Sequence, residues 1–159
     1  MKVVLVCIVT IYLMAIAQLA VAPRIVVAGA EPDFMLIGSI SLGFVLSRIG
    51  SIYTGFAVGL VQGVLVGANL SQFVVTRMLT CYFAARLNES EIEIGPVLGI
   101  LAVALLSFLA SVIFMFFSPP ASIGAYLSAS FFAALYNGLL ALPLLATLRA
   151  VLGRRTAGV

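Results

Sequence analysis

The chain reads PVLGILAVALLSFLASVIFMFF from Pro96 to Phe117, and this stretch contains no charged residue. An α-helix rises about 1.5 Å per residue, and the hydrocarbon core of a bilayer is about 30 Å thick. About 20 consecutive apolar residues therefore make one crossing. This stretch predicts a transmembrane helix.

Similar apolar blocks follow one another along the chain. They are continuously apolar, whereas the strands of a membrane barrel alternate over about 10 residues, so helices are favoured. The six predicted spans cover residues 3–22, 34–47, 50–67, 70–87, 96–117 and 124–148. The polar intervals between them are short. Residues 1–159 are therefore predicted to form a single transmembrane domain, an all-α polytopic membrane bundle of about six helices.

Composition excludes an ordinary soluble domain. Of the 159 residues, 64% are hydrophobic and 8% are charged, against roughly 25% charged in a typical soluble domain. The formal net charge is +3, but the basic residues are scattered at span ends, so nucleic-acid binding is rejected. Cys7 and Cys81 fall inside predicted spans and are too few for a disulfide framework, so we interpret them as packing residues.

The basic residues predict an orientation in the membrane. With six spans, Arg24 flanks one side alone, and the other side receives Lys2, Arg48, Arg86, Arg149, Arg154 and Arg155. The positive-inside rule then places both termini in the cytoplasm. Ala20-Val21-Ala22 has the form of a signal-peptide cleavage site, but the apolar stretch is long and Pro23 would follow the cut. We expect this segment to be the first span.

Four glycines recur at every fourth position in the third predicted span: Gly55, Gly59, Gly63 and Gly67. Four residues advance a helix by about 400°, so these glycines form a slowly rotating groove on one side. A neighbouring backbone can approach such a groove closely. Two interpretations follow, a seam between helices of this chain or a docking face for another membrane protein.

Arg77 lies near the middle of the fourth predicted span. An arginine at a helix centre costs about 2.5–3.5 kcal/mol on insertion scales, so a partner is expected. Candidate partners are Asp33, Glu31 and Gln62, together with free carbonyls near a helix break. The first interpretation is a structural pair or a snorkelling side chain, and the second is a cation that binds a ligand or partner.

Other polar residues also interrupt the apolar spans. Gln18, Gln62 and Asn137 are expected to form hydrogen bonds between helices, worth about 0.6–2 kcal/mol each. Together with Arg77 they are candidates for the lining of a small polar cavity. Asp33 follows Pro32 and is expected to cap the second helix.

Catalytic chemistry has no support in the sequence. The chain has no histidine and one aspartate, no thiol in an activating setting, and no phosphate-binding or nucleophile-elbow motif. Glu89, Glu91 and Glu93 are interpreted as a solvated face near Arg86. We predict that the chain is not an enzyme, with no catalytic residue, cofactor site or metal site.

Several local motifs, taken in order, resemble the MreD family of bacterial rod-shape-determining membrane proteins. The sequence QLAVAPR begins at Gln18, and Pro32-Asp33-Phe34 follows after a short loop. The glycine block, Cys81-Tyr82 and Tyr136-Asn137-Gly138 come next, before Pro143. The chain departs from the family pattern at Gln62-Gly63, where an acidic residue is often expected, and in the acidic loop 88–95.

The resemblance implies a non-enzymatic scaffold of the cell-elongation machinery in the bacterial cytoplasmic membrane. Such a protein would bind MreC, a single-span membrane protein, and would link MreB filaments to peptidoglycan synthesis by RodA and a class B penicillin-binding protein. The family fold is similar to the six-helix S-components of energy-coupling-factor transporters. That likeness implies an alternative function as the substrate-binding subunit of a small-solute, vitamin-type transporter.

Overall fold

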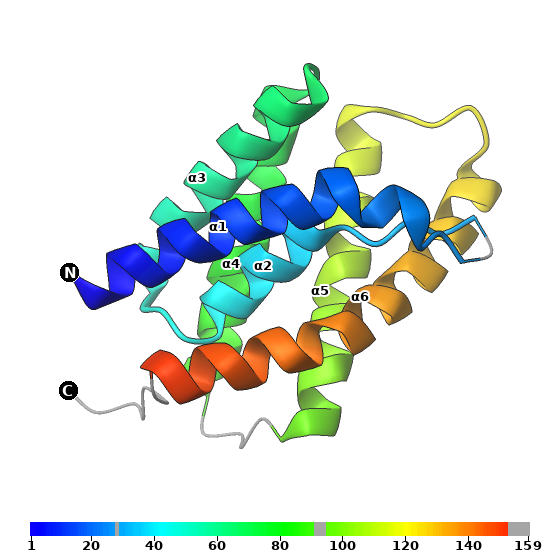
Figure 1. The fold of residues 1–159 in the computed structure, drawn as a ribbon. Helices are drawn as coiled ribbons and strands as arrows, with labels where there is room; N and C mark the ends of the chain where they lie inside the picture. The colour runs from blue at the N-terminus through cyan, green and yellow to red at the C-terminus, as the bar shows by residue number, and fades with distance from the viewer. Residues whose placement is uncertain (28, 91–94, 153–159) are drawn as a thin grey trace.

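The structure, a computed structural model, describes residues 1–27, 29–90 and 95–152. The helices in chain order are α1 (Lys2–Ala20), a 3-10 turn (Ala22–Arg24), α2 (Phe34–Gly43), α3 (Arg48–Val66), α4 (Leu70–Glu89), α5 (Pro96–Phe117) and α6 (Ile123–Leu152) (Figure 1). In the described ranges, β-pairing is confined to an isolated bridge between Val27 and Ala30. The expected all-α class is confirmed for this part of the chain. Glu91, Glu93, Arg154 and Arg155 lie outside the described residues.

Among the described residues, four helices are long and apolar enough to cross a membrane. They are α1 with the turn that follows it, α3, α5 and α6. Helix α4 has 20 residues and is therefore long enough, but Arg77, Arg86 and Glu89 reduce its mean hydropathy. Length and composition thus support a membrane protein, and a total of six crossings stays a prediction.

The segment 34–47, expected to be a span, forms a helix that is shorter than expected. Helix α2 has 10 residues, which gives a length of about 15 Å, half of the hydrocarbon thickness. The chain leaves the helix at Phe44, and a turn leads to Ser47, whose side chain caps α3 by accepting from the N–H of Gly50. Helix α2 is instead a short buried helix, in which every residue from Met35 to Gly43 is buried.

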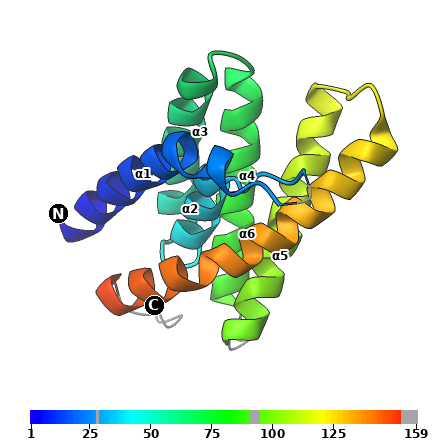
Figure 2. The same ribbon diagram turned by 45° about the vertical axis from the view of Figure 1, so that its right-hand side comes forward.

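Helix α2 lies at the centre of the bundle and contacts every other α-helix. Helices α3 and α4 form one tight hairpin, and α5 and α6 form a second, with α1 lying across α2 (Figures 1 and 2). The main apolar core combines Leu36, Ile40 and Phe44 of α2 with residues of α4, α5 and α6. Because lipid is as apolar as these side chains, close packing supplies most of the stabilisation.

The start of α1 and the end of α6 lie at the same end of the bundle (Figure 1). The start of α3 and the end of α4 meet there too, because Arg48 forms an ion pair with Glu89 at 2.7 Å. Arg86 lies 3.8 Å from the same carboxylate. These charges are partly exposed, so each pair stabilises the fold by about 0–1 kcal/mol. Their position suits the polar boundary of a bilayer.

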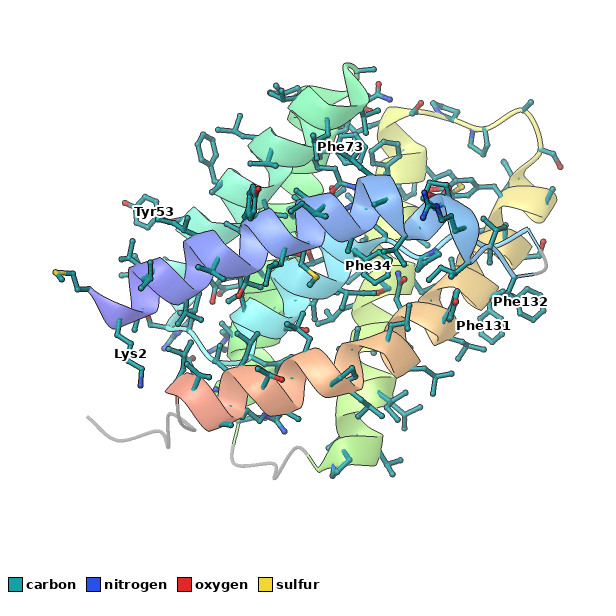
Figure 3. All side chains as sticks on the ribbon, in the orientation of Figure 1. Lys2, Phe34, Tyr53, Phe73, Phe131 and Phe132 are labelled. Atoms are coloured by element: carbon teal, nitrogen blue, oxygen red, sulfur yellow. The ribbon has the colours of Figure 1, made fainter. Side chains whose placement is uncertain are left out.

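The outer surface of the bundle is apolar. Figure 3 shows Tyr53 projecting from α3, and Phe131 and Phe132 projecting from α6, away from the other helices, and all three are exposed. Helix α1 is the most exposed of these helices, because Thr10 is its one buried residue. Such a surface needs lipid or another membrane helix to cover it.

Candidate functional site

A polar cluster surrounds the N-terminus of α2. Asp33 is the N-cap of this helix, and its Oδ1 accepts a hydrogen bond of 2.8 Å from the N–H of Leu36. Pro32 comes before it and discourages helix upstream, so α2 begins here. A carboxylate at this position also faces the positive end of the helix dipole. The expected capping role of Asp33 is confirmed.

Two other helices satisfy two further backbone donors of this turn. Gln18 of α1 accepts from the N–H of Phe34 at 2.7 Å, and Asn137 of α6 accepts from the N–H of Asp33 at 3.0 Å. A helix start in an apolar interior has no water to bond its free N–H groups, so such partners are needed. These two amides therefore hold α2 between α1 and α6.

Arg77 of α4 is 3% exposed and forms an ion pair with Asp33, from Nη2 to Oδ2. Its Nε donates to Oε1 of Gln62 at 2.7 Å, and Nε2 of Gln62 lies 3.3 Å from both carboxylate oxygens of Asp33. The guanidinium also lies 5.7 Å from the ring centre of Phe73. The charge is thus paired within the bundle and not snorkelling.

All five intramembrane polar candidates meet in this one cluster: Gln18, Asp33, Gln62, Arg77 and Asn137. They come from α1, α3, α4, α6 and the start of α2. Glu31, another candidate partner of Arg77, lies instead on the wall of a neighbouring cavity. The cluster connects five elements through buried and partly buried hydrogen bonds, so it defines how these elements dock.

Three of the four glycines form the seam between α3 and α4. A Cβ added at Gly55 would lie 2.5 Å from the carbonyl oxygen of Arg77, and one at Gly63 would lie 2.8 Å from the Cα of Leu70. A Cβ at Gly59 would contact the Cα of Val74 and lie 2.8 Å from the carbonyl oxygen of Phe73. These contacts involve backbone, so the glycines allow the close approach that places Arg77 beside Gln62.

The assignment of Gly67 to this groove is wrong. Gly67 is the C-cap of α3 with φ 70, and nothing lies within 4 Å of a Cβ built there. The left-handed conformation ends the helix and starts the turn to α4, and Asn69 follows with φ 58. Gly67 therefore serves the turn and not the seam.

Two other glycines, Gly43 and Gly138, make close contacts with backbone that spacing alone did not reveal. A Cβ at Gly43 of α2 would lie 2.7 Å from the carbonyl oxygen of Cys81, and one at Gly138 would lie 2.7 Å from the carbonyl oxygen of Ile100. The buried thiol of Cys81 donates to the carbonyl oxygen of Ser39 at 2.8 Å. Cys81 thus packs α4 against α2, as expected for a packing residue.

Two small cavities adjoin the polar cluster, with volumes of about 240 and 210 Å³. Asp33, Leu36, Ser111 and Tyr126 line both of them. The larger one also includes Glu31, Ser107, Ser130 and Asn137 in its wall, and the smaller one includes Arg77, Phe73 and Phe114. The cavities therefore lie between α2, α4, α5 and α6.

The hydroxyl groups of these cavities were not predicted. Ser107 and Ser111 are four residues apart in an apolar helix, so they lie on one face of it. This spacing is the sequence feature that could have indicated a polar lining. Ser111 accepts a hydrogen bond of 2.9 Å at its carbonyl from the hydroxyl of Tyr126. Within the described ranges, no group of three or more His, Cys, Asp or Glu residues could hold a metal ion.

Comparisons of this chain with models of protein families, with curated proteins and with solved structures give no match.

Proposed function

We propose that this chain is an MreD-like, non-enzymatic scaffold of the bacterial cell-elongation machinery. In this role it binds an MreC-like single-span protein and, through it, links MreB filaments to peptidoglycan synthesis by RodA and a class B penicillin-binding protein. The proposal combines the resemblance of the sequence motifs with a helical bundle whose surface is apolar. It places the chain in the cytoplasmic membrane and makes it a participant in cell-shape regulation.

The observation that carries the proposal is the exposure of α1. Only one of its 19 residues, Thr10, is buried. Apolar side chains such as Leu5, Ile8 and Leu13 are exposed along its length. A membrane helix that packs so little against its own chain has a large surface for another helix, and helix association in lipid depends on such packing. We propose α1 as the contact for the single-span partner.

The glycine groove was the first candidate for this contact. Backbone of α4 occupies the groove at Gly55, Gly59 and Gly63, so an external helix has no access to these positions. This geometry favours the internal-seam interpretation and moves the proposed docking face from α3 to α1.

The proposed membrane topology places all six helices, α1 to α6, within the bilayer. Helix α4 crosses with Arg77 shielded by Asp33, and α2 enters the bundle without the length of a full crossing, in an architecture similar to energy-coupling-factor S-components. Both termini are cytoplasmic. The position of Lys2, Arg48 and Arg86 at the same end of the bundle supports this orientation by the positive-inside rule.

Purification of the tagged chain from native membranes, followed by mass spectrometry, tests the scaffold role. We expect recovery of a single-span membrane protein and of peptidoglycan-synthesis enzymes. A photoreactive residue in place of Leu13 of α1 should then cross-link to the single-span partner. The matched control is Leu105 of α5, which is also exposed and should give no such product. Cross-linking from Leu105 alone would contradict the proposed docking face.

A second candidate function is the substrate-binding subunit of a vitamin-type transporter, and the cavities beside Asp33 favour it. Under this hypothesis the same purification recovers ATP-hydrolysing transporter subunits. A vitamin-type solute should also raise the thermal midpoint of the purified chain, because a ligand at 100 times its Kd stabilises by about 2.7 kcal/mol. Absence of a shift across a broad panel of such solutes would remove this candidate.

A further inference from the structure

Three buried serines, Ser41, Ser51 and Ser107, have a hydroxyl without a hydrogen-bond partner among the described residues, and of these Ser107 lines a cavity beside Asp33. Ser107 is 1% exposed, and the cavity that it lines has a volume of about 240 Å³. Serine hydroxyls in apolar helices normally bond to a carbonyl one turn earlier, as Ser111 does to the carbonyl of Ser107 at 3.2 Å. A buried polar group without a partner calls for an explanation, and a bound ligand supplies one.

The charges around the cavities select the kind of ligand. Glu31 and Asp33 are among the residues that line the larger cavity. Asp33 and Arg77, which form an ion pair, are among those that line the smaller one. One negative charge is therefore in excess. The hydroxyl of Tyr126 donates to the carbonyl of Ser111, so its proton is already engaged and does not favour an anion. Acceptors and a net negative charge favour a cationic donor over an anion.

The volume indicates the size of the bound group. A sealed cavity of about 150 Å³ accommodates benzene, and this cavity, which is partly open and has a volume of about 240 Å³, accommodates a group of roughly ten non-hydrogen atoms.

We propose that the cavity between α2, α5 and α6 binds a small organic cation with a protonated primary amine, held by Glu31 and Ser107. The inference stands apart from the scaffold and transporter roles, since either kind of protein could carry this site. Two kinds of molecule carry such an amine: a free solute and the headgroup of an ethanolamine lipid.

Ethanolamine is the probe that tests this site. The full chain is placed in nanodiscs of phosphatidylcholine and phosphatidylglycerol, which contain no primary amine, and is titrated at constant ionic strength. We expect ethanolamine to raise the thermal midpoint and to give a saturable heat of binding, whereas neutral ethanediol and anionic glycolate do neither. A lack of ethanolamine binding, or an equal response to ethanediol, overturns the proposal.

Variants separate a ligand role of Ser107 from a structural one. Ser107→Ala should weaken ethanolamine binding about fivefold, the loss of about one hydrogen bond, while the unliganded midpoint stays unchanged or rises. The matched control Ser128→Ala changes an exposed serine of α6 and should leave binding intact. A lower unliganded midpoint with unchanged ethanolamine affinity would make the hydroxyl structural and overturn its assignment.

Glu31→Gln tests the charge, with Glu89→Gln at the far end of the bundle as its control. The first variant should weaken ethanolamine binding about fivefold, as expected for a partly exposed charge pair, and the second should not. Equal affinity of both variants and the native chain overturns the role of Glu31. Nanodiscs that contain phosphatidylethanolamine identify the source: a raised midpoint with loss of ethanolamine binding supports the lipid headgroup, and unchanged ethanolamine binding supports a free solute.

Discussion

Exchange of Arg77 for methionine should lower the free energy of unfolding by about 3–5 kcal/mol, because it leaves the carboxylate of Asp33 without its charged partner in the bundle. Asp33→Asn should have an effect of the same size. Asparagine is as good an N-cap as aspartate, so this variant keeps the cap of α2 and removes only the charge. Unfolding of the purified chain in mixed micelles of mild detergent and sodium dodecyl sulfate measures both effects.

The double variant Arg77→Met with Asp33→Asn is the sharpest test of the pair. Because a buried ion pair can be replaced at little net cost, the double variant should lose less stability than the two single variants added together. Arg86→Met is the matched control on the same helix. Its side chain is 53% exposed, so we expect a change of about 0–1 kcal/mol. Additive losses in the double variant would contradict a direct interaction.

The Arg77→Met variant should insert into the membrane more easily than the native chain, although its folded bundle is less stable. Removal of an arginine from a helix centre makes insertion easier by about 2.5–3.5 kcal/mol. A glycosylation-based insertion assay on α4 alone should therefore show equal or better insertion, although the complete bundle is less stable. Poorer insertion of the variant would mean that α4 is not a crossing helix.

Gly59→Leu is expected to prevent the native packing of α3 on α4. Overpacking of a core typically costs about 1–3 kcal/mol when side chains can adjust. Here the added Cβ would meet backbone, including the carbonyl oxygen of Phe73 at 2.8 Å, which no rotamer change can move. We expect loss of the monodisperse species in size-exclusion chromatography in detergent. Gly59→Ala should give an intermediate loss of thermal stability.

Gly124→Leu controls for the side chain itself. Gly124 lies in α6, and nothing lies within 4 Å of a Cβ built there, so this variant should fold normally. Separation of Arg77 from Gln62 should accompany the Gly59→Leu defect, because the close approach of α3 and α4 places them together. A Gly59→Leu variant with native stability would show that these two helices do not meet at this seam.

Part of the candidate site could be predicted because each member is unusual by itself. Arg77 needed a partner in an apolar setting, and Asp33 after Pro32 had the chemistry of a helix cap. Gln62 and Asp33 were two of the candidate partners, and the ion pair and hydrogen bonds join all three residues. Which candidate Arg77 would choose depended on distances between helices, which no spacing along one helix contains.

The hydroxyl-lined cavities had a weaker signal, the spacing of four residues between Ser107 and Ser111. Ser107 and Ser130 belong to apolar helices, where serine is common as a small packing residue. A cavity exists only where several helices fail to fill the space between them, so it is a property of their joint packing. Gly67 also shows that spacing alone is insufficient. Its position matched the glycine groove, but in the structure its left-handed backbone ends α3 and begins a turn.

The sequence alone determined the properties that depend on a single helix. The apolar content of the blocks predicted helices and a lipid environment, the spacing of Gly55, Gly59 and Gly63 predicted a close-packing face, and the charge in an apolar block predicted that Arg77 has a partner. The tertiary structure decided that α2 is a short central helix, that α4 fills the glycine groove, and that Gln18 and Asn137 meet at Asp33. These features depend on contacts between segments far apart in the chain, and such contacts form only when the helices dock.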